Sequence, residues 1–241
     1  MSIVTNENIH QMYLKAWQKD ALERFHEKIT NKEFLFPCIP ATIGYHLNRF
    51  SFGFASNLQN PSSSRELAQL LKDYTSIYKS LGMYTSLIIF YEPFPDIENP
   101  FSVEQYEQLF WEQLNQISSF DEQKWPNHIP SDPIQHMWEF CFHGEQYFMY
   151  CATPAHINRK SRQFPYFMLA ITPRWVLEQF NTTSFHAEKV KEKIRERLAE
   201  YDTISIHPNL NTYGKNDNFE WKQYFLRDDN TSISKCPFHK K

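Results

Sequence analysis

The chain has 241 residues, of which 17% are aromatic and only five are glycine. This length allows one large domain with a sizeable core, and nothing in the sequence divides it cleanly into two. The few glycines argue against phosphate-binding loops, and neither a GxGxxG nor a Walker-type pattern occurs. The formal net charge is −3 with a pI near 6.4, so no basic field favours nucleic acid.

Neither export nor membrane insertion is indicated. No run of about 18 uncharged apolar residues is present, and the first ten residues lack the basic, apolar and small-residue order of a signal peptide. The four cysteines are widely spaced and form no CxxC pair, which is typical of a reducing compartment. We therefore expect a cytoplasmic protein with free thiols and no membrane partner.

Apolar spacing in the first half of the chain predicts three helices and one strand. Apolar residues at three- and four-residue steps predict an amphipathic helix over 9–29. The stretch 34–54 mixes prolines and glycines with aromatics, which favours an irregular, pocket-lining segment. A helix over 63–82 should follow, a buried strand over 84–91, and a further helix over 102–118.

Two of these predicted helices carry an N-terminal signature. Ser63 with Glu66, and Ser102 with Gln105, have the spacing of a capping box. In this motif the side chains at the helix start bond reciprocally to the first free backbone N–H groups. We therefore expect both helices to begin at these serines.

The second half alternates predicted strands and helices. Residues 137–142 and 145–151 flank His143-Gly144, a spacer that predicts a β-hairpin. The remaining predicted elements are a strand over 166–172, a helix that begins near Pro173, a charged helix over 185–201 and a loop-rich tail over 202–241, in which 220–226 is the best-ordered piece.

These elements predict an α+β fold with a mixed or antiparallel central sheet flanked by helices. We expect one domain over residues 1–241. The N-terminal helix (1–30) and the tail (202–241) should pack on that same domain.

The segment between two predicted strands, 152–162, concentrates candidate binding groups. His156 could bind a metal ion while Arg159 and Arg162 bind carboxylates, because a guanidinium matches a carboxylate with a planar fork of donors. Haem b needs this combination of an axial ligand, two propionate partners and an apolar surround. The alternative is a solvated basic loop between two strands.

Other side chains compete for the role of metal ligand. His207, next to Pro208, could point at a ligand or make a capping or core hydrogen bond, and His143 could be the hairpin turn residue alone. The Cys38 thiolate could bind iron, or the side chain could be a small buried hydrophobe. A zinc site from Cys38, Cys236 and His239 is conceivable, although no close ligand pair supports it.

Asp228 and Asp229 are the candidate contacts for a cationic substrate. They follow a stretch that we expect to be an aromatic strand, and they precede Asn230. Carboxylates could hold a guanidinium by charge-assisted hydrogen bonds. Three polar residues at the end of an element are otherwise typical of a turn.

Several motifs, taken in this order, resemble the YqcI/YcgG family. The likeness covers residues 34–238 and rests on Phe36-Pro37-Cys38, Trp138–Gly144, Ala152–Arg162, His207–Gly214, Glu220–Asn230 and Cys236-Pro237-Phe238. Some members of that family are haem-dependent N-oxygenases that hydroxylate guanidine-bearing substrates such as arginine. The resemblance implies haem b, dioxygen, an electron donor and a guanidine- or amine-bearing substrate.

The resemblance also implies roles for individual residues. His156 becomes the axial ligand of the haem iron, with Arg159 and Arg162 as partners of the propionates. His207, His143 and Cys38 remain rivals for the iron, and Asp228 and Asp229 would line the substrate side. The expected activity is a haem-dependent N-monooxygenase. The alternative is a haem-binding or sensing protein, or a small-ligand binder, without oxygen chemistry.

Overall fold

One mixed sheet of five strands organises the protein. The computed structural model describes residues 3–5, 8–95, 101–181, 184–213 and 215–239. The strand order is β1-β2-β5-β4-β3, with bounds Phe50–Ala55, Ser86–Tyr91, Met168–Pro173, Glu145–Ala152 and Phe140–Phe142 in that order. β1 and β2 are parallel, and the other neighbours are antiparallel. The predicted α+β class with a mixed sheet is confirmed.

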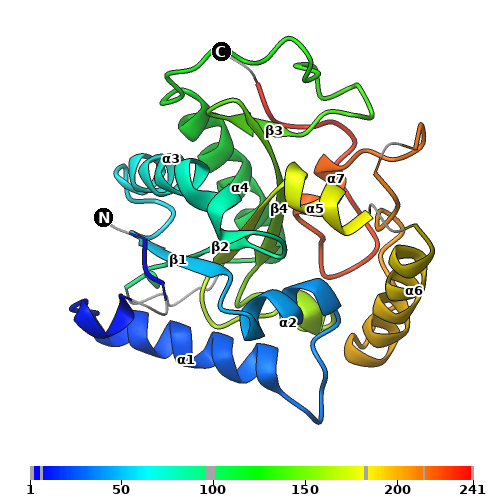
Figure 1. Ribbon diagram of the computed structural model, residues 1–241, viewed down its shortest axis with the longest axis horizontal. Coiled ribbons are helices and arrows are strands. Elements are labelled where there is room, and N and C mark those ends of the chain that lie inside the picture. Colours follow the sequence, from blue (N-terminus) through cyan, green and yellow to red (C-terminus); the bar gives the residue numbers. More distant parts are fainter. Residues whose placement is uncertain (1–2, 6–7, 96–100, 182–183, 214, 240–241) are drawn as a thin grey trace.

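Helices cover both faces of the sheet (Figure 1). One face carries α1 (Ala16–Thr30) and α2 (Ile39–His46), and the other carries α3 (Ser63–Leu81), α4 (Val103–Ser118) and α7 (Trp221–Tyr224). The remaining elements are α5 (Arg174–Asn181), α6 (Ser184–Tyr201) and the 3₁₀ turns η1 (Ile9–Gln11) and η2 (Lys160–Arg162). α6 packs against α5 and η2 at one side of the sheet (Figure 1).

The apolar run in β2 reflects this burial on both faces. Leu87 and Ile89 pack into the core under α3 and α4. Ile88 and Phe90 point the other way, into the core under α1. Successive side chains of a strand alternate between faces, so a strand covered on both sides has no polar side.

The expectation of an irregular segment over 34–54 is wrong, because this stretch contains α2 and most of β1. Pro40 lies in the first turn of α2, where a missing backbone N–H costs nothing. Gly44 is buried with its Cα next to the Tyr84 carbonyl and the Phe50 ring, where a larger side chain would not fit. Pro40 and Gly44, two of the four prolines and glycines that suggested a loop, are thus compatible with a helix at their positions.

The two predicted capping boxes have different outcomes. At α4, Ser102 and Gln105 make both reciprocal bonds, as expected. At α3 the N-cap is Ser62 and no side chain caps it. The Glu66 carboxylate instead accepts hydrogen bonds from the Ser56 N–H (2.7 Å) and hydroxyl (3.1 Å), which attaches the helix to the end of β1.

Two other predictions concern backbone geometry. The hairpin turn is confirmed, because His143 and Gly144 have φ of 50° and 79° and join β3 to β4. The N-terminal helix is shorter than predicted and begins at Ala16. Residues 9–11 form the separate turn η1.

The tail is anchored to the sheet by a buried ionic group. Arg174, the first residue of α5, donates to the carboxylates of Glu139 and Glu220, the latter at 3.2 Å. The ring of Tyr213 lies 3.6 Å from the Arg174 guanidinium carbon. These contacts hold the tail against the strand ends.

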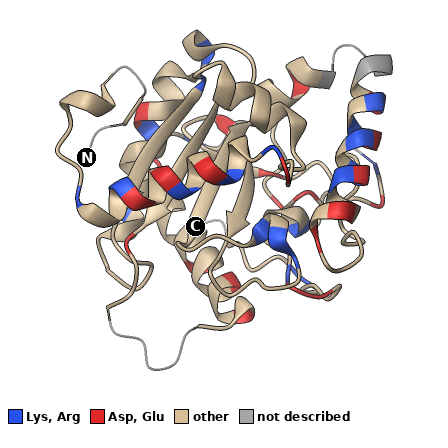
Figure 2. Ribbon diagram, turned by 90° about the horizontal axis from the view of Figure 1, so that it is seen from below, with Lys and Arg blue, Asp and Glu red and all other residues tan. Residues whose placement is uncertain are grey.

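The charged side chains are mixed rather than gathered by sign. Figure 2 shows Lys and Arg interleaved with Asp and Glu along α1 and α6. No helix within the described residues is long and apolar enough to cross a membrane.

Candidate functional site

His156 is buried and both of its ring nitrogens have protein partners. Nε2 donates to the Leu226 carbonyl at 2.8 Å, so Nδ1 is the acceptor for the Thr153 hydroxyl at 2.8 Å. Thr153 Oγ1 in turn accepts from the Ala155 N–H. Burial lowers the pKa of His156 to about 4, which keeps the ring neutral. A metal ion could bind His156 only if one of these hydrogen bonds were replaced.

Arg159 is also buried, and its guanidinium holds the tail. Nε donates to the Arg227 carbonyl (2.9 Å) and Nη2 to the Asp229 carbonyl (2.9 Å). Nη1 reaches the Ser205 carbonyl at 3.3 Å. The nearest carboxylate, that of Asp202, is 3.9 Å from Nη1. The guanidinium therefore donates mainly to backbone carbonyls that lie far away in the sequence.

Arg162 has a similar arrangement. Its Nη1 donates to the carbonyls of Cys151 (3.2 Å) and Tyr224 (3.1 Å), and Nη2 donates to that of Gln223 (3.0 Å). The ring of Tyr150 lies 4.0 Å from the guanidinium carbon. For Arg159 and Arg162, a role as propionate partner would compete with these bonds and stays a prediction.

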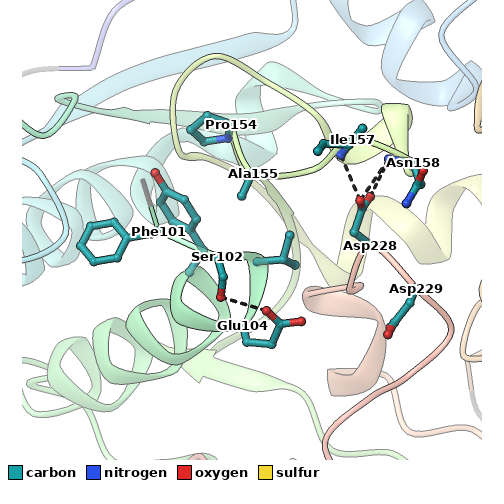
Figure 3. A pocket seen from close by; sticks show the side chains of 11 residues that line it. Phe101, Ser102, Glu104, Pro154, Ala155, Ile157, Asn158, Asp228 and Asp229 are labelled. Carbon is teal, nitrogen blue, oxygen red and sulfur yellow. Dashed lines mark hydrogen bonds between the residues drawn. The ribbon is translucent and has the colours of Figure 1, made fainter. Parts of the chain in front are cut away.

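Asp228 binds the loop that carries His156. Its carboxylate accepts hydrogen bonds from the backbone N–H groups of Ile157, Asn158 and Arg159 at 2.7–3.1 Å. Figure 3 shows this carboxylate turned toward the loop, whereas Asp229 points away from it. Three N–H groups that converge on one carboxylate form an anion-binding nest filled by the protein itself.

Asp229 makes the turn that the sequence suggested as an alternative. Its Oδ1 accepts from the Thr231 N–H (2.8 Å) and hydroxyl (2.6 Å). These bonds lower the pKa of Asp229, which stays ionised. The side chain is exposed, so its free oxygen remains accessible.

Of the two rival histidines, only His207 has hydrogen-bond partners at both ring nitrogens. His207 is buried, its Nε2 donates to the Thr231 carbonyl at 3.2 Å, and its Nδ1 accepts from the Asn209 N–H at 3.1 Å. Burial lowers its pKa. His143 lies in the hairpin turn, where its backbone N–H donates to the Asp121 carboxylate, and its ring Nε2 is buried without a hydrogen-bond partner.

Cys38 lines a cavity of about 170 Å³ at the N-terminus of α2. We call it the Cys38 cavity, and its other lining residues are Phe36, Pro37, Phe148, Tyr150, Arg159, Ser161, Arg162, Ile194, Leu198, Asp202, Leu210 and Leu226. Burial raises the pKa of the Cys38 thiol, while the Ala41 N–H and the Arg162 charge act in the opposite direction. The thiol is free.

The donor set of this cavity includes the groups that a thiolate-bound haem needs, one cysteine and two guanidinium groups, with apolar side chains beside them. Asp202, Ser161 and Tyr150 add polar groups to the same wall, where the Asp202 carboxylate accepts hydrogen bonds from the N–H and hydroxyl of Ser161. The volume is smaller than the roughly 300–1,000 Å³ of most cofactor pockets. A group as large as haem would therefore fit only after lining side chains had moved outward.

A second and larger cavity of about 570 Å³ lies between the start of α4, the loop that carries His156 and the segment that carries Asp228 (Figure 3). We call it the acidic cavity, and it is lined by Phe101, Ser102, Val103, Glu104, Tyr106, Pro154, Ala155, Ile157, Asn158, Asp228 and Asp229. Its charged lining residues are all carboxylates, and two aromatic rings accompany them. This composition favours a cationic ligand.

The two cavities share a wall. Asn158 and Asp228 line the acidic cavity, whereas their neighbours Arg159 and Leu226 line the Cys38 cavity. Among the lining residues of the two cavities, Cys38, Asp228, Asp229 and the two arginines are predicted from the sequence. Glu104 is not, because sequence alone cannot distinguish it from any acidic residue in a first helical turn.

The conceivable zinc site is not formed. Within the described part of the chain, no three His, Cys, Asp or Glu side chains come together in a group that could hold a metal ion. Cys38, Cys236 and His239 are therefore not a ligand set. A haem iron needs only one such side chain and is unaffected by this finding.

Comparisons with known proteins agree in one family. The chain is 46% identical to "Uncharacterized protein YqcI" of Bacillus subtilis (strain 168), covering 94% of this chain and 89% of that protein. It is 43% identical to "Uncharacterized protein YcgG" of the same organism, over 95% and 90% of the two chains.

A third relative has a name that states an activity. "Putative N(omega)-hydroxy-L-arginine synthase DcsA" of Streptomyces lavendulae is 30% identical, over 93% of this chain and 85% of that protein. No solved structure matches. The model of the YqcI/YcgG family matches residues 25–239, and the protein belongs to the YqcI/YcgG family.

Proposed function

We propose that this protein is a haem-dependent oxygenase that hydroxylates a nitrogen of a guanidine- or amine-bearing small molecule such as arginine. The observation that carries the proposal is a free cysteine in a cavity with two guanidinium groups, next to a cavity lined by carboxylates. The name of the 30% identical relative points to the same reaction class. Haem b would supply an iron that binds and activates dioxygen, with an external electron donor.

Among the rival ligands, we favour Cys38 over the expected His156. The sulfur lies at the N-terminus of α2, where the helix dipole, the Ala41 N–H and the Arg162 charge all favour the thiolate and oppose the rise in thiol pKa that burial causes. Both nitrogens of His156 and of His207 already have hydrogen-bond partners. A thiolate would bind iron without breaking a hydrogen bond between two segments of the fold.

The lining side chains would have separate tasks. Phe36, Phe148 and Leu226 would exclude water from the iron. In the acidic cavity, Glu104 and Asp229 would attract the cationic end of the substrate by charge. Asp228 would act indirectly, because its bonds to three N–H groups shape the wall between the two cavities.

The ligand assignment is tested by the spectrum of the protein purified from iron-supplemented cells. We expect a Soret band whose ferrous carbon monoxide complex shows the red shift of thiolate ligation. Cys38→Ser should remove that signature, while His156→Ala should keep it. Cys236→Ser, which changes another half-buried cysteine, is the matched control.

The reaction is tested with haem-loaded protein, a reductase system, labelled dioxygen and a panel of guanidines and amines. We expect a one-oxygen mass gain in a product. A colourless wild-type protein would refute the haem, and haem-loaded protein without product from the whole panel would refute the oxygenase.

A binder without oxygen chemistry is the second candidate. It is favoured by the wall that separates the acidic cavity from the Cys38 cavity. Binding of arginine to the haem-free protein, unchanged in Cys38→Ser and lost in Glu104→Gln, would support it.

A further inference from the structure

A cation with unused donors lies next to residues that line the Cys38 cavity. Arg197 lies on α6 between Ile194 and Leu198, and both of these residues line the cavity. Residues three apart share one face of a helix, so Arg197 lies on the same side of α6 as Ile194. Its Nη1 is 3.4 Å from the carbonyl of Phe36, another lining residue.

Arg197 differs in this respect from Arg159 and Arg162. A guanidinium has five N–H donors, and the bond to Phe36 is long. The Nε atom is buried and has no hydrogen-bond partner. A buried donor without an acceptor is costly, so an acceptor supplied by a ligand would be stabilising.

No carboxylate of the described residues neutralises Arg197. The ion pairs on α6 join Lys191 to Glu188 and Lys193 to Glu196. Asp202, inside the cavity, accepts instead from the N–H and hydroxyl of Ser161. The charge of Arg197 is therefore available to an anion from outside the chain.

A second cation, Lys28, lies beside the same lining residue, Phe36, and adds to the positive electrostatic potential there. Lys28 Nζ is 5.8 Å from the centre of the Phe36 ring and 5.3 Å from that of Tyr201. It donates to the carbonyls of Lys160 (2.9 Å) and Gln163 (3.0 Å). Lys28 is thus fixed by backbone, and Arg197 is the cation with donors left over.

We propose that Arg197 binds a carboxylate of the molecule that occupies the Cys38 cavity. A carboxylate presents two oxygens that match the guanidinium fork. The proposal rests on the proposed function for the identity of that molecule, which offers two sources. One is a propionate of the haem, and the other is the carboxylate of an amino acid that enters the Cys38 cavity of the haem-free protein.

The experiment compares ligands that differ only in the carboxylate. Arg197→Met keeps an apolar stem and removes the charge and donors, and Arg197→Lys restores the charge. Lys193→Met removes a fully exposed cation from the same helix and is the matched control. Apoprotein is titrated with haem b and its dimethyl ester, and separately, by calorimetry, with arginine and agmatine.

We expect Arg197→Met to raise the dissociation constant of one carboxylate-bearing ligand about 10- to 100-fold, as for a lost hydrogen bond to a charged group. Its carboxylate-free counterpart should bind unchanged, and Arg197→Lys should restore part of the affinity. An effect on haem but not on the ester identifies the propionate. An effect on arginine but not on agmatine identifies the substrate.

Equal losses of affinity for a carboxylate-bearing ligand and for its carboxylate-free counterpart would overturn the proposal, because Arg197 would then only support the fold. Unchanged binding of both acids would overturn it as well. If the wild-type protein binds no haem, the proposed function fails while the comparison of arginine with agmatine still tests Arg197. A wild-type protein that binds neither haem nor arginine would refute both.

Discussion

Replacing Arg159 by Met should destabilise the fold strongly, whatever the protein binds. The guanidinium donates to the carbonyls of Ser205, Arg227 and Asp229 and to the side chain of Asn230. A hydrogen bond to a charged group contributes about 1.5–3 kcal/mol. The contributions of several bonds from one side chain are not additive, and Met fills much of the volume of Arg. We therefore expect the free energy of unfolding to fall by about 3–5 kcal/mol, the usual cost of breaking a buried charged network.

Such a loss is a large part of the roughly 5–15 kcal/mol by which a domain is stable. The assay is urea unfolding of the apoprotein, with the midpoint and slope followed by circular dichroism. Lys160→Met, which changes the exposed neighbour, is the matched control and should lie within about 0.5 kcal/mol of the parent. If Arg159→Met lowers the free energy of unfolding by less than about 1 kcal/mol, the hydrogen bonds to the tail contribute little to stability. Arg159 would then be a cation that is available to a ligand.

Three further predictions concern the same loops and the helix that follows Cys38. The folded protein holds His156 neutral, because burial lowers its pKa from 6.5 to about 4. The free energy of unfolding should therefore fall by up to about 3 kcal/mol as the pH is lowered from 6.5 to 4. In urea titrations at several pH values, His156→Gln should show a weaker dependence on pH than the parent. Asp228→Asn should lower the free energy of unfolding by about 1–3 kcal/mol, because the amide offers only one acceptor oxygen to three N–H groups, and an unchanged melting temperature would contradict the nest. Gly44→Ala should cost about 3 kcal/mol, because the added Cβ would meet the Tyr84 carbonyl oxygen, and thermal unfolding that matches the parent would contradict this packing.

Local signals in the sequence determined much of the secondary structure. The capping box of Ser102 with Gln105 and the hairpin turn at His143-Gly144 were predicted correctly, because each depends on residues within a few positions of one another. The stretch 34–54 was predicted wrongly. That Pro40 and Gly44 are tolerated in a helix becomes clear only from their positions in α2 and from the residues packed against it.

The chemistry of the site was decided by the tertiary structure. The sequence placed His156, Arg159 and Arg162 together and suggested that their polar atoms were free. Most of their partners come from the segment 223–230, more than sixty residues further along the chain, which no local pattern could indicate. Backbone carbonyls of a buried, loop-rich tail must find donors, and these three side chains supply them. The sequence by itself thus supplied candidate residues for a binding site, and only the folded chain decided that most of them hold the tail while Cys38 lines a cavity.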